Sequence, residues 1–291
     1  MTFLQNRKIF KIVFLLVLLT ACKEEKSIMS VYSIHEVQAK VDELLKKQRA
    51  EDILVVFDVD MTLTQPDHAA TYYPAIKKFK SIIKNIFEPL TPAQRDIALT
   101  LTTKLPQKLI EKDSPTIIRA MQDKGINVIA LTATLTGSWK DSKNKIVFKR
   151  KDTLQKLGFN FSFQGRVVPY MNFPKYADGY PMLYHGVLCS NGENNEIGKG
   201  KTLSVFLRQV GMTKGAPYGS GYVPKVVIMV DDREKNFVDI QKTLAVDFPA
   251  IQFIGIKYDG ALGYAPQDIS EKDFEEFWQE MADKAKRDCP L

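Results

Sequence analysis

Two aspartates stand one residue apart directly after a short apolar run. Residues Ile53 to Phe57 are all apolar, with β-branched and aromatic side chains, and they predict a strand buried on both faces. Asp58 and Asp60 follow this run, and Thr62 comes next in the alternation. Carboxylates are costly inside a core unless they are paired or bind a cation, and open α/β sheets collect ligands at the carboxyl ends of their strands. We therefore expect both carboxylates at the mouth of a parallel sheet. The plainer alternative is a turn with two solvated carboxylates.

Two further predicted strands end in polar side chains. The mainly apolar run 126–131 ends in Thr132, and the apolar run 226–230 ends in Asp231 and Asp232. Taken alone, a threonine at the end of a strand is usually structural. Its place in an ordered series of such strand ends favours a functional role.

A lysine pair opens the predicted helix between those two strands. Lys199 and Lys201 precede Leu203 and Leu207, which mark the buried face of the helix. Cations are unfavourable at a helix N-terminus, which favours a functional reason for one of them, although two solvated lysines remain the alternative. A nucleotide-binding P-loop would need glycine at position 195, where this chain has asparagine.

Taken in order, these four points resemble the four motifs of the haloacid dehalogenase (HAD) phosphohydrolase superfamily. The Asp-x-Asp-x-Thr motif at Asp58 is the first, Thr132 the second, Lys199 the third (with Lys201 as second choice) and Asp231 with Asp232 the fourth. The resemblance covers residues 51–258. It implies an α/β fold, a HAD-like Rossmannoid parallel sheet flanked by helices, with a small helical cap insertion.

The resemblance also implies a mechanism of phosphomonoester hydrolysis. Asp58 would be the nucleophile that forms an aspartyl-phosphate. Asp60 would protonate the leaving oxygen and then deprotonate the attacking water. Thr132 and Lys199 would hold the transferring phosphoryl group of a small phosphorylated substrate.

Mg²⁺ is the cofactor that the resemblance implies, a hard cation that prefers oxygen ligands. Its protein ligands would be Asp58, the backbone carbonyl of Asp60, and Asp231, with Asp232 in support. Because Asp60 is present, the chain resembles phosphatases and phosphomutases of the superfamily more than its dehalogenases or P-type ATPases. Met61 interrupts the longer aspartate run that is usual in class C acid phosphatases, so another lipoprotein branch of the superfamily is favoured.

The chain divides into four predicted parts. These are a lipoprotein signal peptide (1–21), a tether with an amphipathic helix (22–50), a HAD-like core domain (51–66 and 113–291) and the helical cap insertion (67–112). His68, Tyr72 and Tyr73 at the entrance of the insertion are candidates to line the substrate pocket, with packing as their alternative.

Several local elements are predicted from periodicity and helix signals. Residues 64–67 are expected to form a loop, and a helix is expected to run through Leu99 and Leu109. Ser114 is expected to act as the N-cap of the helix that Pro115 opens. The segment 166–185 has no clear periodicity and is left unassigned.

The N-terminal residues are typical of an export signal. Three basic residues precede the apolar block Ile12–Leu19, which is too short to span a bilayer. The following Leu-Thr-Ala-Cys resembles the lipobox of bacterial lipoproteins, so Cys22 is the expected lipid anchor, and an ordinary signal peptide is the alternative. Lys23 after it indicates the outer membrane, at its periplasmic face.

Composition narrows the class of protein. The 291 residues are 45% hydrophobic and 26% charged, as in globular chains. The formal charge of +7 falls to about +4 without the signal segment, which suits an anionic substrate, and no sequence feature of a nucleic-acid binder is present. Cys189 and Cys289 are left open as either a disulfide pair or free thiols.

The alternative function is a catalytically silent HAD-like lipoprotein that binds a phosphorylated ligand or a protein partner. The intact motif carboxylates argue against it.

Overall fold

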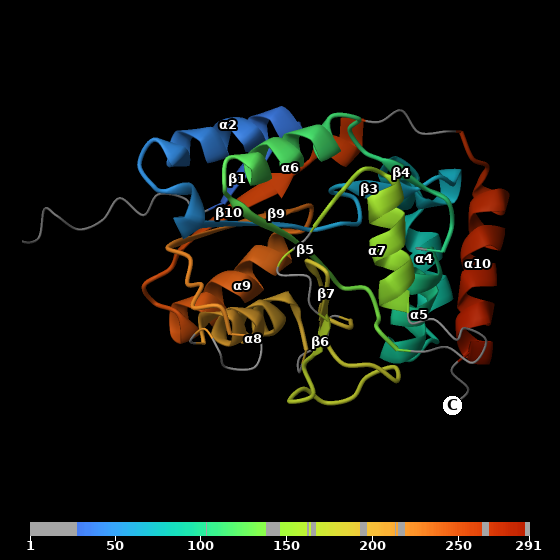
Figure 1. The fold of residues 1–291 in the computed structure, drawn as a ribbon. Coiled ribbons are helices and arrows are strands. Elements are labelled where there is room, and N and C mark those ends of the chain that lie inside the picture. Colours follow the sequence, from blue (N-terminus) through green and yellow to red (C-terminus); the bar gives the residue numbers. More distant parts are fainter. Residues whose placement is uncertain are drawn as a thin grey trace, which may run out of the picture.

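The structure, a computed structural model, describes residues 28–288 except 103, 138–145, 162, 164–166, 193–196, 213, 215–218 and 264–267. This part of the chain has an α/β fold with a central eight-stranded sheet between helices (Figure 1). The strand order is β1 (Ile28–Val31), β10 (Gln252–Tyr258), β9 (Val226–Asp231), β2 (Ile53–Phe57), β5 (Asn127–Thr132), β8 (Val187–Cys189), β7 (Met182–Tyr184) and β6 (Val167–Pro169). The first six are parallel, and β7 and β6 extend the sheet antiparallel.

Helices cover both faces of the parallel part of the sheet (Figure 1). On one face lie α2 (Ile34–Leu45) and α6 (Ser114–Asp123), and on the other lie α8 (Lys199–Gly211) and α9 (Glu234–Asp247). Side chains of β2 point alternately to the two faces of the sheet. Val55 and Phe57 belong to the core beneath α2 and α6, whereas Leu54 and Val56 belong to the core beneath α8 and α9. This two-sided burial explains why β2 is apolar at every position.

A second layer of helices lies beside the sheet. The short strands β3 (Thr64–Pro66) and β4 (Gln107–Leu109) pair antiparallel. Between them runs the helical insertion, which we define as α3 (Tyr73–Lys78), α4 (Lys80–Phe87) and α5 (Pro92–Thr102) with one preceding 3₁₀ turn (Ala69–Thr71). The C-terminal helix α10 (Glu271–Asp288) packs along α4 and α5 (Figure 1). Their apolar faces form a third core cluster, separate from the two on the sheet.

The position of α10 differs from the predicted domain boundaries. The sequence assigned this helix to the core domain, whereas its apolar face is buried against the helical insertion. The N-terminal boundary differs as well. Residues 28–31 were expected within the tether, but they form β1, which pairs with β10 at the edge of the sheet.

Three local predictions were wrong. Residues 64–66 form a strand instead of a loop, and the predicted helix through Leu109 ends at Thr102 because residues 107–109 pair with that strand. Ser114 is the first helical residue and not the N-cap, which is Asp113, and the buried Ser114 hydroxyl has no hydrogen-bond partner in the described part of the chain.

Other predictions were confirmed. The amphipathic helix from Ile34, the helix after Pro115 and the strands leading to Thr132 and Asp231 are all present. The unassigned segment 166–185 contains β6 and β7, joined by a loop. The remaining elements are α7 (Ile146–Lys156) and two further 3₁₀ turns (Ala50–Asp52 and Gly260–Gly263). Among the described residues, no helix is long and apolar enough to span a membrane.

Candidate functional site

The predicted site residues meet at the carboxyl edge of three neighbouring strands. Asp58 directly follows β2, Asp231 is the last residue of β9, and Thr132 is the last residue of β5. Because β9, β2 and β5 are adjacent and parallel, their carboxyl ends lie at one edge of the sheet. The backbone amide of Asp58 donates a hydrogen bond to Val230 at 2.8 Å, which fixes the start of the site loop on the sheet.

Lys199 ties two of these carboxylates together. Its Nζ lies 2.8 Å from Asp58 Oδ1 and 2.7 Å from Asp231 Oδ2, and all three side chains are buried. Lys201 is exposed on the same helix, so the geometry selects Lys199 between the two candidates. Gly200 allows this placement, because a Cβ there would lie 2.7 Å from the backbone oxygen of Asp239 on α9.

Three carboxylates converge beside this lysine. Oxygens of Asp58, Asp231 and Asp232 all lie within 4.8 Å of one another. Asp231 is oriented by Asn236, whose Nδ2 donates to both carboxylate oxygens at 2.9 Å, and by the backbone amide of Arg233 at 2.8 Å. Sequence reasoning missed Asn236, although its position on the helix after the acidic pair offered a signal.

The electrostatics of this cluster favour a cation. Burial raises the pKa of Asp58 well above its usual range, against the lowering effect of Lys199, and the neighbouring Asp231 and Asp232 raise it further. Burial also raises the pKa of Asp232 to about 6, against the lowering effect of Arg233. The pKa values of Asp58 and Asp232 stay raised although Lys199 is in contact with two carboxylates of this cluster, so the single ammonium does not offset their burial and mutual repulsion. A hard divalent cation among their oxygens would supply further positive charge, and the donor set fits such an ion.

Asp60 points to a different partner. Its carboxylate is outside the three-carboxylate cluster, and its Oδ2 lies 3.4 Å from Thr132 Oγ1. The same oxygen forms an ion pair with Nη2 of Arg150, a buried residue on α7. Met61 next to it has φ 62°, a left-handed conformation that turns the chain directly after Asp60. The predicted metal contact through the Asp60 backbone carbonyl stays a prediction.

Arg150 was missed because nothing local marks it. It sits between two lysines in a helix that reads as a solvated basic segment, ninety positions after Asp60 in the chain. Only the tertiary structure, which packs α7 against β7 and brings Arg150 to Asp60, reveals the contact, since a pairing across such a separation leaves no periodic signal.

Threonines line the end of β5. Thr132 Oγ1 lies 3.0 Å from Thr134 Oγ1 and accepts from the Thr134 amide at 3.3 Å. Thr136 is held by Asn191 Oδ1, which accepts from its amide at 2.8 Å. These bonds fix the loop that follows Thr132 against the residues after β8.

The loop between β6 and β7 links this region to the helical insertion. Tyr176 donates its hydroxyl to Asp96 of α5 at 2.6 Å, and its backbone oxygen accepts from Asn191 Nδ2 at 2.8 Å. Gly137 packs so closely on this loop that a Cβ would lie 2.0 Å from the backbone oxygen of Ala177. The segment that sequence reasoning left unassigned therefore connects the sheet edge to the insertion.

The candidate pocket residues at the start of the insertion take part in packing. The His68 ring stacks on Phe277 of α10 at 4.3 Å between centroids, and Tyr72 is buried with its hydroxyl donating to Asp67 at 3.0 Å. The Tyr73 side chain is outside the described part. Cys189 is a buried free thiol. Its possible partner Cys289 and the expected lipid anchor Cys22 both lie outside the described residues.

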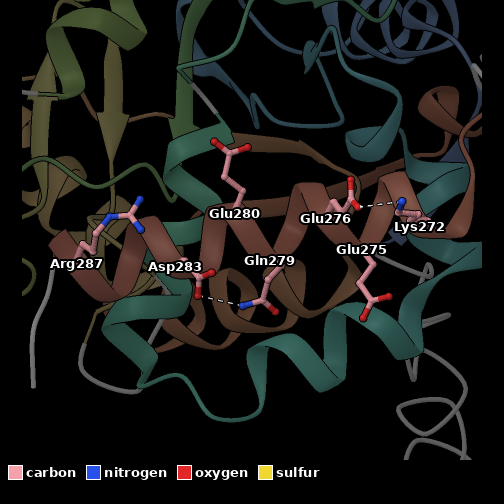
Figure 2. A pocket seen from close by; sticks show the side chains of 7 residues that line it. All are labelled: Lys272, Glu275, Glu276, Gln279, Glu280, Asp283 and Arg287. Atoms are coloured by element: carbon pink, nitrogen blue, oxygen red, sulfur yellow. Dashed lines mark hydrogen bonds and ion pairs between the residues drawn. The ribbon is translucent and has the colours of Figure 1, made fainter.

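Two surface hollows lie away from the site. One of about 540 Å³ lies on the outer face of α10, where Figure 2 shows its side chains. It is lined by Lys272, Glu275, Glu276, Gln279, Glu280, Asp283 and Arg287. The other, of about 410 Å³, includes Asn127 and Val128 at the start of β5, the end of that strand opposite to Thr132. None of the predicted site residues lines either hollow.

Similar proteins occur in Rickettsia. The chain is 24% identical over 265 residues to an uncharacterized protein of Rickettsia bellii, covering 86% of this chain and 83% of that protein. It is 27% identical over 264 residues to one of Rickettsia felis, covering 84% and 81%. A third, from Rickettsia conorii, is 25% identical over 266 residues, covering 86% and 82%. Residues 30–287 match one family over nearly the whole described fold, and the chain therefore belongs to the family described as "Protein of unknown function (DUF2608)".

Proposed function

We propose that this chain is a Mg²⁺-dependent phosphomonoester hydrolase of the HAD type that works through an aspartyl-phosphate. One observation carries the proposal: Lys199 bridges Asp58 and Asp231 at the carboxyl edge of adjacent parallel strands, with Asp232 close by. A nucleophilic carboxylate, a phosphoryl-binding cation and a metal-binding pair are what phosphoryl transfer needs, since that chemistry depends on positioning and charge neutralisation.

The first half of the reaction would use Asp58 and Asp60. A carboxylate oxygen of Asp58 attacks phosphorus, and the bond from phosphorus to the ester oxygen breaks. Asp60 gives its proton to that leaving oxygen. Thr132 and Lys199 bind the phosphoryl oxygens, and Lys199 also keeps Asp58 oriented through their 2.8 Å contact.

The second half would regenerate the enzyme. Asp60, now a carboxylate, takes a proton from water, and the resulting hydroxide attacks phosphorus of the aspartyl-phosphate. The bond from phosphorus to the Asp58 oxygen breaks, which frees the Asp58 carboxylate and inorganic phosphate. Asp60 is 41% exposed at its side chain, an exposure compatible with contact to both the leaving group and water.

Asp58, Asp231 and Asp232 would hold Mg²⁺, with the backbone carbonyl of Asp60 as a fourth ligand. When bound, the ion neutralises charge on the phosphoryl group and on the crowded carboxylates. Asn236 keeps Asp231 in one orientation for this role through its two 2.9 Å contacts.

The helical insertion would serve as the cap over this site, and a small phosphorylated molecule would be the substrate. We propose an exported protein anchored through lipidated Cys22, at the periplasmic face of a bacterial outer membrane. The modest basic excess of the chain suits an anionic substrate.

The test is release of phosphate from an aryl phosphate by residues 23–291, with Mg²⁺ and then with EDTA. We expect metal-dependent turnover that Asp58→Asn abolishes, because the amide cannot form the aspartyl-phosphate. Asp123→Asn, on the exposed surface of α6, is the matched control and should retain full activity.

A second measurement separates the silent binding protein from the enzyme. Binding of inorganic phosphate without turnover on a broad panel of phosphate esters would contradict the hydrolase and favour the binding protein. Turnover that is equal in Asp58→Asn and in the unmodified chain would assign the activity to a contaminant and overturn the proposal.

A further inference from the structure

A buried arginine that the sequence did not mark lies behind the proposed acid–base residue. Arg150 is 3% exposed, and its guanidinium nitrogens are shut off from solvent. Its Nη2 pairs with Asp60 Oδ2. None of its three guanidinium nitrogens has a hydrogen-bond partner of ordinary geometry among the described residues, so the contact with Asp60 is an ion pair by proximity. The guanidinium is therefore placed in the core with one charged contact shown, the carboxylate of Asp60.

Burying a charged guanidinium costs free energy, so its ion pair with the Asp60 carboxylate is important for the stability of this arrangement. A guanidinium loses strong hydration when it is buried, and pairing with a carboxylate offsets this loss. The thiol of Cys189 also lies near Arg150, and burial raises its pKa to about 12, so it carries no charge that could replace Asp60.

The two sides of this pair have opposite exposure. The Arg150 side chain is 1% exposed and the Asp60 side chain is 41% exposed, so the arginine anchors the carboxylate from the protein side and leaves its outer side open. Thr132 Oγ1, 3.4 Å from the same Asp60 oxygen, flanks it along the sheet edge. Without Arg150, a half-exposed aspartate beside a left-handed Met61 would be free to rotate into solvent.

We propose that Arg150 is a positioning residue that holds the Asp60 carboxylate for proton transfer to the leaving group and from water. This inference rests on the proposed hydrolase, because it assigns Asp60 its acid–base role. Proton transfer requires the carboxylate within hydrogen-bond reach of the leaving oxygen, so fixing its orientation affects the chemical step more than substrate binding.

Leaving groups of different basicity provide the test. Arg150→Met keeps the side-chain volume similar and removes the charge. A nitroaryl phosphate expels its leaving group with little help from an acid, whereas an alkyl phosphate needs protonation. We expect Arg150→Met to lower kcat for the alkyl phosphate at least about 10-fold more than for the nitroaryl phosphate, with KM little changed, since general acid catalysis contributes about 10²–10⁴-fold.

The Asp60 variant shows whether the effect passes through that residue. Asp60→Asn should show the same dependence on leaving group. The double variant Asp60→Asn/Arg150→Met should be no slower than Asp60→Asn, because the arginine has no carboxylate left to position. Arg150→Lys keeps the charge and should recover part of the loss, and Arg119→Met on the exposed face of α6 is the matched control.

The outcomes are distinct. Equal losses on both substrates, or losses that multiply in the double variant, would make Arg150 a packing residue and overturn the inference. No phosphate release from any substrate by the unmodified chain would overturn the hydrolase and this role with it. A double-mutant cycle of Asp60 and Arg150, measured on the urea unfolding midpoint, then separates the two failures. Energetic coupling between the two residues would show that the ion pair forms but serves no catalysis. Absence of coupling would show that the ion pair itself does not form. If Arg150→Met does not fold, Arg150→Lys carries the comparison.

Discussion

Lys199 lies between carboxylates that would otherwise face each other inside the protein. Its ammonium contacts Asp58 and Asp231 at 2.8 and 2.7 Å, all in a region closed to solvent. At this scale the site has an excess of negative charge: three carboxylates from two strand ends surround one ammonium, and their oxygens lie close enough together to hold a hard cation. Two predictions belong to these residues.

The first prediction compares the two lysines of α8. Lys199→Met removes the only cation shown between Asp58 and Asp231 in the described structure, so we expect unfolding free energy to fall by about 3–5 kcal/mol, the usual cost of leaving a buried partner unpaired. In the proposed enzyme kcat should also fall about 10²–10³-fold. Lys201→Met, at an exposed position two residues away, should change neither. Urea unfolding and kcat measure this, and similar effects from both lysines would contradict the assignment.

The second prediction concerns metal and pH. Burial raises the pKa of Asp58 and raises that of Asp232 to about 6, so both carboxyl groups hold protons more strongly than ordinary aspartates. Below pH 6 protons therefore compete with a cation for the Asp232 oxygens. A raised carboxyl pKa also means that the metal-free fold loses stability as pH rises through that value. Mg²⁺ should therefore raise Tm little at pH 5 and by roughly 5–10 °C at pH 7.5 with ligand in large excess.

Thermal unfolding with Mg²⁺ and with EDTA at the two pH values is the measurement. Asp232→Asn should reduce the effect at the higher pH, whereas Asp123→Asn on the exposed surface of α6 should not. An equal Mg²⁺ effect at both pH values would show that the ion binds somewhere other than these carboxylates.

At the scale of elements, one helix belongs with a part of the chain far from it in sequence. The indole of Trp278 on α10 donates a hydrogen bond to the backbone oxygen of Ala70 at 3.0 Å and meets Phe87 of α4 edge-on. The insertion therefore depends on α10 for its core, and the two form one helical layer beside the sheet. The proposed cap would be made of both.

Trp278→Ala tests this dependence. Removing a buried tryptophan leaves a cavity and an unpaired carbonyl, so we expect a loss of about 3–5 kcal/mol in unfolding free energy. Glu276→Ala, on the exposed side of the same helix, should cost little. Chemical denaturation of both variants measures the difference. A loss below about 1 kcal/mol for Trp278→Ala would show that α10 contributes little to the stability of the layer.

At the scale of the whole molecule, the fold begins close to the proposed anchor. Strand β1 begins at Ile28, six positions after Cys22. Since an extended chain spans at most about 3.6 Å per residue, lipidation at Cys22 would hold this edge of the sheet within roughly 20 Å of the membrane. The site at the carboxyl ends of the strands would then work close to the bilayer.

Cys22→Ser tests the anchor. A serine cannot carry the thioether-linked lipid, so we expect the protein to move from the membrane pellet to the soluble fraction after cell lysis. Cys189→Ser, at the buried thiol, serves as a control for loss of a cysteine and should leave the distribution unchanged if it folds. Equal pelleting of Cys22→Ser and the unmodified chain would contradict lipid anchoring.

Much of the site could be predicted because each of its main residues is marked locally. Continuous apolar runs predict buried strands, and the polar residue that ends each run falls at the carboxyl edge. This placed Asp58, Thr132 and Asp231 correctly, and the motif at the start of α8 placed Lys199. Helices with a clear apolar face, such as Ile34–Leu45, were predicted for the same reason.

Tertiary structure decided the rest, because long-range packing leaves no periodic mark on the chain. The pairing of β3 with β4, the docking of α10 on the insertion and the edge position of β1 each join segments far apart in sequence. The contact of Arg150 with Asp60 is of the same kind. The sequence by itself determined which residues end the strands. Only tertiary packing determined that α7 holds Asp60 in place and that α10 covers the insertion. These side chains are buried between elements that lie far apart in sequence, and no local pattern connects such elements.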